Sequence, residues 1–126
     1  MKNLSRLLAF VLLCSFTPEA KAQKNEWKKL GEDDGVTVYW RWRQLYKNSY
    51  TSELKLENSN PFNVEVTVMP AFTCPDGIEY KQGGVVTLVT ASGIRMGEQD
   101  GLAFYPCQGE KIPRKAALEK LKVNRK

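Results

Sequence analysis

The chain has 126 residues and a formal net charge of +5, and it contains no histidine. It therefore lacks the commonest general base, the usual partner of a serine or cysteine nucleophile and the commonest zinc ligand. Paired carboxylates can still hydrolyse a glycoside, but the acidic residues cluster in glycine-containing turns, where the backbone favours them. We expect a protein that is not an enzyme and that holds no metal or cofactor.

Residues 1–22 have the layout of a secretory signal peptide. Two positive charges precede an unbroken apolar run over residues 7–13, and Ala20-Lys21-Ala22 supplies the small residues of a cleavage site. The apolar run is far shorter than the roughly 20 residues of a bilayer span, so no membrane-spanning helix is expected. We therefore predict an exported protein, periplasmic or extracellular, with its mature domain beginning at Gln23.

Cleavage after Ala22 also removes Cys14 and leaves Cys74 and Cys107. Two cysteines in an exported chain predict one disulfide, and two buried free thiols are the alternative. A bridge between positions 33 residues apart would contribute about 3–4 kcal/mol through loop-closure entropy. Lipidation at Cys14 stays open as another alternative, although Leu13 before it is larger than such sites prefer.

The first part of the mature chain alternates between polar and apolar residues, which is typical of half-buried strands. Residues 26–30 can form a short strand, and the Asp34-Gly35 pair that follows is the strongest short signal for a hairpin. Residues 36–45 then form the next predicted strand. One of its faces carries Val36, Val38, Trp40 and Trp42, and the other carries Thr37, Tyr39, Arg41 and Arg43.

Residues 49–58 and 62–74 continue the alternation. Asn58-Ser59-Asn60-Pro61 between them is dense in turn-forming residues, so we expect the two strands to pair as an antiparallel hairpin. Pro70 cannot donate a ladder hydrogen bond, and it therefore predicts a sheet edge or a bulge. We interpret it as the point where the strand bends away from its first partner.

Three shorter strands are expected beyond Cys74, over residues 78–81, 85–91 and 102–108, and glycine-rich turns separate them. Six or seven short strands in one domain over residues 23–110 predict an all-β fold. The expected architecture is an antiparallel β-sandwich of about seven strands closed by one disulfide. A small open barrel is the alternative.

Residues 100–107, Asp-Gly-Leu-Ala-Phe-Tyr-Pro-Cys, resemble the approach to the second cysteine of immunoglobulin-like domains. In those domains an acidic turn residue precedes a strand with a tyrosine two residues before the cysteine, and its hydroxyl bonds back to the turn. Tyr105 stands at that position, whereas Pro106 and the short cysteine spacing depart from the pattern. The resemblance implies an immunoglobulin-like or fibronectin-like sandwich as architecture, and it carries no function with it.

Residues 111–126 differ from the body, because they hold seven lysines and arginines against one glutamate while residues 23–110 carry −3. Pro113 suits a first helical turn, and Ala117, Leu118 and Leu121 have helical spacing. We expect a basic C-terminal tail or a short helix that could touch anionic surfaces. Nucleic acid is not an expected partner, because the body of the chain is acidic.

The candidate ligand or partner surface consists of Tyr39, Arg41, Trp42 and Arg43. Tryptophans at strand spacing can stack on sugar rings or anchor a protein partner, and the arginine row can bind carboxylates or phosphates. Trp40 and Trp42 continue the parity of the valines, so we interpret Trp40 as a core residue, and for Trp42 core and surface both stay open.

We expect a small non-enzymatic binding or interaction domain of a bacterial-type cell envelope, with a protein or glycan as its unidentified partner. The alternative is a carbohydrate-binding module that uses the exposed aromatics of residues 39–43.

Overall fold

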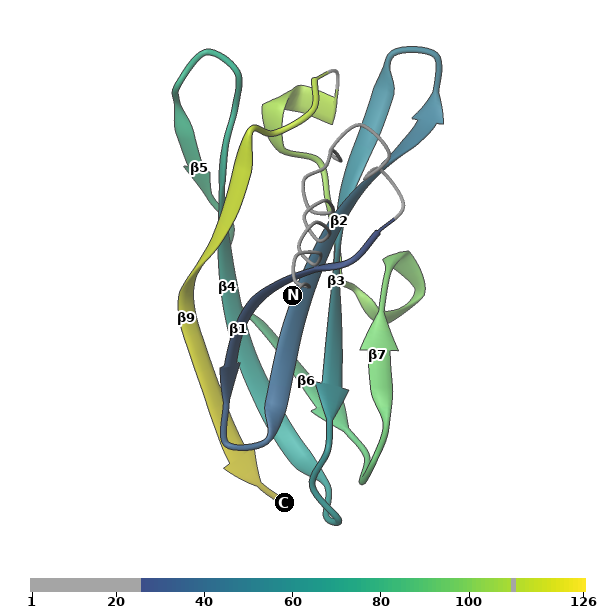
Figure 1. The fold of residues 1–126 in the computed structure, drawn as a ribbon, viewed down its shortest axis with the longest axis vertical. Coiled ribbons are helices and arrows are strands. Elements are labelled where there is room, and N and C mark those ends of the chain that lie inside the picture. The colour runs from purple at the N-terminus through teal and green to yellow at the C-terminus, as the bar shows by residue number, and fades with distance from the viewer. Residues whose placement is uncertain (1–25, 110) are drawn as a thin grey trace, which may run out of the picture.

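The computed structural model describes residues 26–109 and 111–126, which form two antiparallel sheets around one core (Figure 1). The predicted signal peptide and Cys14 lie outside the described residues. Sheet A has the order β1-β2-β3-β7 with β8 also paired to β3, and sheet B has the order β5-β4-β6 with β9 also paired to β4. The predicted all-β antiparallel class is confirmed.

The strands of sheet A are β1 (Lys28–Asp33), β2 (Val36–Tyr46), β3 (Ser49–Asn58), β7 (Ile94–Met96) and β8 (Ala103–Phe104). Those of sheet B are β4 (Val64–Thr73), β5 (Glu79–Lys81), β6 (Val85–Val89) and β9 (Lys115–Arg125). Two short 3₁₀ segments, η2 (Glu98–Asp100) and η3 (Pro106–Gly109), lie on either side of β8. Strands β7 and β9 were not predicted. Residues 92–101, which contain β7, were expected to form a turn-rich connection, and residues 111–126, which contain β9, were expected to form a tail or a short helix.

The turn between β1 and β2 forms as predicted. Asp33 pairs with Val36, and the two residues between them, Asp34 and Gly35, have φ angles of 45° and 81°. Two central residues with positive φ match the twist of the flanking strands, which explains why aspartate followed by glycine is favoured here.

The expected hairpin between β3 and β4 does not form, because these two strands belong to different sheets. Buried Asn58 is the centre of the crossing: its Nδ2 donates to the carbonyl oxygens of Phe62 (2.9 Å), Val89 (3.2 Å) and Thr90 (3.0 Å). Its Oδ1 accepts from the backbone N and from Nδ2 of Asn60, both at 2.9 Å. One side chain thus ties the end of sheet A to sheet B, which the turn-rich composition alone does not reveal.

The predicted C-terminal helix is not seen, and the segment expected as a basic tail contributes the eleven-residue strand β9. Strand β9 pairs with β4 from Thr73 to Val64, and the register shifts where Met69 faces Lys120 and Pro70 faces Leu118. Glu119 is therefore an extra residue opposite a proline that has no N–H to donate. Because of the shift, inward-facing residues have even numbers before it and odd numbers after it. The apolar residues of β9 therefore have a spacing that resembles that of a helix.

Pro70 also marks a change of partner on the other side of β4. The sequence predicted such a change, but the strand that β4 leaves is β6 and not the expected one over residues 49–58. Strand β4 pairs with β6 over Val64–Val68 and with β5 over Ala71–Thr73. The proline lies between these two ladders, where its missing donor costs no inter-strand hydrogen bond.

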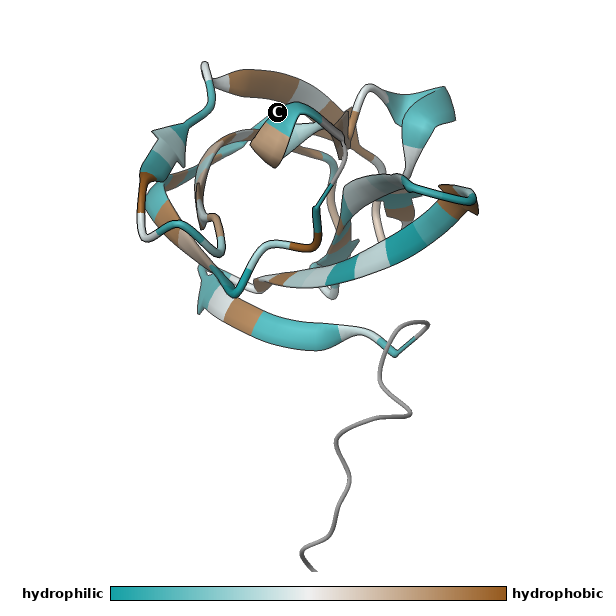
Figure 2. Cartoon of the chain, turned by 90° about the horizontal axis from the view of Figure 1, so that it is seen from above, coloured by the Kyte–Doolittle hydropathy of each residue, from teal (hydrophilic) through white to brown (hydrophobic). Residues whose placement is uncertain are grey.

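The core lies between the two sheets, which curve around a common interior when seen from above (Figure 2). Its buried residues are Val36, Val38, Trp40, Leu54, Leu56, Val64, Val66, Val68, Phe72, Val89, Leu102 and Phe104. Trp40 is only 5% exposed and packs against Phe72 with ring centroids 6.5 Å apart, which confirms its interpretation as a core residue. In the described part of the chain there is no helix with the length and apolarity to cross a bilayer.

Replacing Asn58 with alanine should lower the free energy of unfolding by about 2–3 kcal/mol, because buried carbonyl groups lose a donor. Urea denaturation measures the change. Asn124→Ala on the exposed side of β9 is the matched control, and we expect it to change stability by less than about 0.5 kcal/mol. Equal effects of the two substitutions would show that the crossing does not depend on Asn58.

Candidate binding surfaces

The four residues predicted as a ligand surface lie on two different faces of β2. Tyr39, Arg41 and Arg43 lie on the outer face of sheet A, where their side chains contact Glu57 or Glu53 of β3. Trp42 lies on the inner side, where it is half-buried, packs against the core and meets Tyr50 edge-on at 5.9 Å. The structure therefore brings together three of the four residues and separates the tryptophan from them.

Glu53 is the acceptor for both arginines of the outer face. The Nε of Arg41 donates to its Oε1 at 3.0 Å, and the Nη2 of Arg43 donates to its Oε2 at 2.8 Å. Although Glu53 points outward, its side chain is only 3% exposed. An internal carboxylate thus occupies the position that a ligand carboxylate was expected to take.

The aromatic rings of this face are covered by cations from the same chain. Arg41 lies 4.3 Å above the ring of Trp27, and Lys55 lies 5.0 Å from Trp27 and 4.7 Å from Tyr39. Partial burial and the Glu57 carboxylate, which accepts the phenol hydrogen bond at 3.3 Å, raise the pKa of Tyr39. A sugar ring would have to displace these cations, so the stacking arrangement expected around residues 39–43 is not open.

An open hollow of about 510 Å³ lies beside the Arg41–Glu53–Arg43 group. Its remaining lining comes from Met96 and the segment Gly97–Gln99. Three or more potential metal-ligating side chains do not come together anywhere in the described residues. The hollow offers mixed charge and one thioether, which can make polar contacts with a ligand.

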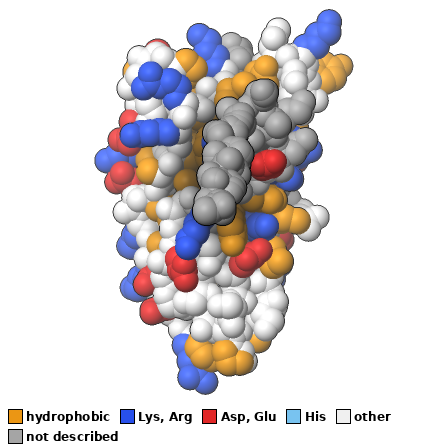
Figure 3. Space-filling view, viewed as in Figure 1, with side chains coloured by type: hydrophobic (Ala, Val, Ile, Leu, Met, Phe, Trp, Pro, Cys, Tyr) orange, Lys and Arg blue, Asp and Glu red, His pale blue; other side chains and the backbone are white. Residues whose placement is uncertain are grey.

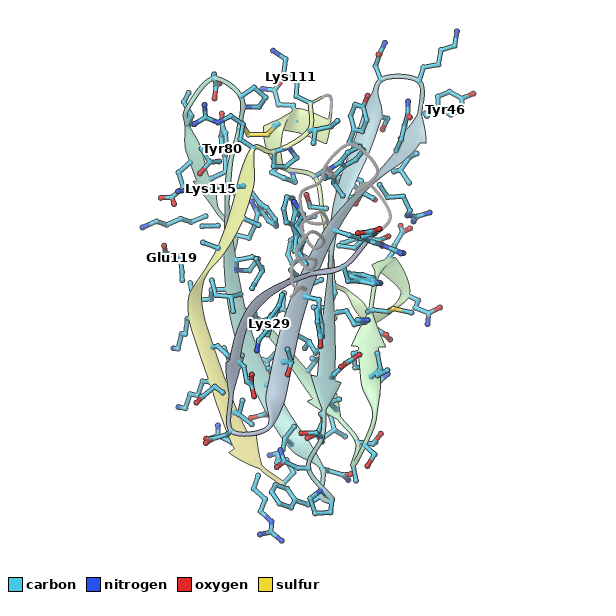
Figure 4. All side chains as sticks on the ribbon, viewed as in Figure 1. Lys29, Tyr46, Tyr80, Lys111, Lys115 and Glu119 are labelled. Carbon is cyan, nitrogen blue, oxygen red and sulfur yellow. A yellow bond between two sulfur atoms is a disulfide. The ribbon has the colours of Figure 1, made fainter. Side chains whose placement is uncertain are left out.

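A second surface, which the sequence did not predict, lies at the end of the molecule that carries the disulfide. The β2–β3 turn, the β4–β5 turn and η3 all lie at this end (Figure 1). Five large hydrophobic side chains are exposed there: Leu45, Tyr46, Ile78, Tyr80 and Tyr105. We call this set the disulfide-end cluster. Figure 4 labels Tyr80 and Tyr46 on opposite sides of this end, with Lys111 between them in the view, and orange and blue side chains are neighbours there in Figure 3.

The predicted disulfide between Cys74 and Cys107 is present, with the two Cα atoms 5.7 Å apart. It joins the end of β4 to η3, where Cys107 and Gln108 have φ angles of 58° and 59°. Left-handed conformations cost energy for residues other than glycine, and they persist only where surrounding structure fixes them. The covalent link to the buried Cys74 is such a constraint.

A smaller hollow of about 210 Å³ opens next to the disulfide. It is lined by Cys74, Pro75, Asp76, Tyr80, Cys107, Gln108 and Lys111. The floor is fixed, because Asp76 accepts a hydrogen bond from the backbone of Ile78 at 2.9 Å and Cys74 accepts one from Gly77 at 2.8 Å. The hollow combines an aromatic wall with an anion, a cation and an amide.

Tyr105 does not occupy the position that the immunoglobulin-like resemblance implied. Its side chain is about half exposed, and no hydrogen bond from its hydroxyl occurs within the described residues. Pro106 begins η3 directly after it, so the chain turns away before a strand can seat the ring. The signal that could have found this cluster is Tyr46, a large hydrophobic residue between the predicted strands 36–45 and 49–58; the other four members lie within predicted strands.

No family model matches this chain, and no curated protein or solved structure is similar to it. The function of the surfaces must therefore be inferred from their own geometry.

Replacing Glu53 with glutamine should destabilise the fold by about 1–3 kcal/mol, because two guanidinium groups lose their shared counter-charge. Glu79→Gln in β5 is the matched control, since Glu79 is exposed and has no ion-pair partner among the described residues. Urea unfolding of both variants measures the difference. A cost below about 0.5 kcal/mol for Glu53→Gln would mean that the arginines do not depend on this carboxylate.

Replacing both Cys74 and Cys107 with serine should lower the free energy of unfolding by about 3–4 kcal/mol, because the bridge closes a loop of 33 residues. The measurement is urea denaturation, with the unmodified protein under reducing conditions as an independent second test. A reduced wild-type protein as stable as the oxidised one would contradict the prediction.

Proposed function

We propose that this protein is a small exported, non-enzymatic binding domain that recognises a partner at the cell envelope through the disulfide-end cluster. The signal-peptide pattern of residues 1–22 supports export, and a disulfide is typical of oxidising compartments. The absence of histidine from the sequence supports a role other than catalysis.

The observation that carries this proposal is the exposure of large hydrophobic side chains on three segments at one end of the molecule. Five of the nine large hydrophobic residues that are exposed in the described part of the chain belong to the cluster, and Tyr46 is 79% exposed. Large hydrophobic side chains that stay exposed at one end of a folded domain are candidates for contact with a partner. Tyrosines on loops supply large contact areas at a small cost in conformational entropy.

The constrained backbone of this end favours recognition further. Ile78 and Tyr80 follow one end of the disulfide, and Tyr105 precedes the other, so these side chains belong to loops that are covalently joined. A loop that is ordered before binding loses less entropy when it meets its partner. We infer that the partner is a protein with an apolar patch. The experiment below also tests a glycan as the alternative partner.

We also infer that the two sheets form an immunoglobulin-like sandwich. Two antiparallel sheets, one disulfide and the resemblance of residues 100–107 support this architecture. The exposed Tyr105 differs from the buried corner tyrosine of that family.

The test uses a Tyr46→Ala/Tyr105→Ala variant and an Ile94→Ala control, because Ile94 is 53% exposed, close to the 49% of Tyr105, but lies on β7, away from the disulfide end. Immobilised proteins are incubated with envelope extract and, separately, with a glycan array. We expect specific capture by the wild type and the control, and at least a tenfold loss in the double variant, as for hot-spot tyrosines.

Circular dichroism and urea unfolding establish that the variants are folded. Capture that is the same for all three proteins, or capture by none of them together with a blank glycan array, would refute the proposal.

A further inference from the structure

The outer face of sheet B carries two kinds of side chain in adjacent rows. Thr67 of β4 pairs with Lys122 of β9 on one side and with Val86 of β6 on the other. In the next row along β4, Met69 pairs with Lys120. Directly paired residues lie on the same face of a sheet, so lysines line one margin of this face and aliphatic residues line the other.

The lysines of β9 are available for an external anion. Lys115, Lys120 and Lys122 are exposed, and no carboxylate lies within 4.0 Å of their ammonium groups among residues 26–109 and 111–126. Figure 4 shows Lys115 and Glu119 projecting away from the body of the molecule.

Two of the three carboxylates of the same surface form ion pairs, and the third, Glu79, lies across Thr73 from Lys115. Glu119 pairs with Lys81 at 3.5 Å, and Glu65 pairs with Lys126 at 3.8 Å. The positive charge of the three lysines is thus not cancelled by these two neighbours.

The aliphatic margin is equally exposed. Val86 is 60% exposed and Leu88 is 42% exposed. Met69 of β4 continues this margin, because its Cγ lies 3.2 Å from the position that a Cβ on Gly84, the residue before β6, would occupy. Methionine, valine and leucine therefore form an apolar strip next to the lysine row.

The free edge of β6 is a less suitable docking site than this face. The Nε of Arg95 donates to the carbonyl oxygen of Leu88 at 3.0 Å and so occupies one acceptor that an added strand would need. Strand addition depends on a row of unpaired backbone groups. The face with its side chains, rather than the edge with its backbone, is the surface left open.

We propose that the outer face of sheet B docks on an anionic lipid bilayer. Lysines near such a surface are attracted to the lipid phosphates, and each contributes about a fivefold gain in affinity. The apolar strip would enter the boundary between headgroups and acyl chains, as the apolar faces of interfacial segments do. A soluble linear polyanion would use only the lysine row, so a bilayer accounts for both halves of the face.

This docking surface is separate from the disulfide-end cluster, and it does not depend on the proposed partner. A protein held by sheet B on a membrane would keep the ends of the sandwich accessible. The two inferences can therefore fail independently.

The test is co-sedimentation of the purified protein with two kinds of vesicle. One is made of phosphatidylglycerol and phosphatidylcholine in equal parts, and the other of phosphatidylcholine alone. We expect binding to the anionic vesicles that weakens with added salt. Lys120→Gln/Lys122→Gln should weaken it about 25-fold, and Val86→Ser/Leu88→Ser should also weaken it.

The matched control is Lys28→Gln/Lys47→Gln, which removes the same charge from exposed positions outside sheet B. We expect it to bind like the wild type. The proposal is overturned if the control loses as much affinity as the β9 variant, or if the anionic vesicles bind no protein. It is also overturned if Val86→Ser/Leu88→Ser has no effect while dextran sulfate competes fully, because the face would then bind soluble polyanions.

Discussion

The missing N–H of Pro70 determines how sheet B is assembled. Strand β4 is central in that sheet, and a residue without a donor can lie in a central strand only where the ladder is interrupted. On one side the interruption is the exchange of β6 for β5, and on the other it is the extra residue Glu119 in β9. One cyclic side chain thus fixes both the partners of β4 and the register of the C-terminal strand.

The register of β9 in turn decides which side chains meet the solvent. Beyond the bulge, Leu121 and Val123 pack against the core, and Lys120 and Lys122 face outward. Before it, Ala116 and Leu118 are the inward residues. Without the shift, the two halves of the strand could not both present apolar residues to the interior, because a slip of one residue reverses the faces.

Features of the fold that depend on neighbouring residues could be predicted from the sequence. Local chemistry predicts the Asp34-Gly35 turn and the alternation in β2, β3 and β4. The disulfide was predicted differently, from the presence of two cysteines in the mature chain. The helix expected over residues 111–126 was wrong, because the bulge opposite Pro70 converts two stretches with a period of two into an apparent helical spacing. The hairpin expected after β3 was wrong because Asn58 bonds to groups as distant as Thr90, which no local pattern records.

The candidate surfaces were less predictable than the fold, since they depend on cross-strand register. Alternation placed Tyr39, Arg41 and Arg43 together, but only the register shows that Glu53 lies opposite Arg41 and binds both arginines. The disulfide-end cluster is assembled from three turns that are distant along the chain. In the sequence only Tyr46 lay outside a predicted strand, and no local pattern showed that these segments share one end of the molecule.

The contact of Arg95 with the Leu88 carbonyl has a consequence for how the protein behaves at high concentration. Arg95 is itself oriented by Asp100, whose other carboxylate oxygen accepts the backbone N–H of Met96 at 2.8 Å. A bulky cation therefore stands at the open margin of sheet B, where a second molecule would otherwise add its own strand. At this edge the Arg95 side chain blocks one acceptor that strand addition by another copy would need, and so works against edge-to-edge aggregation there.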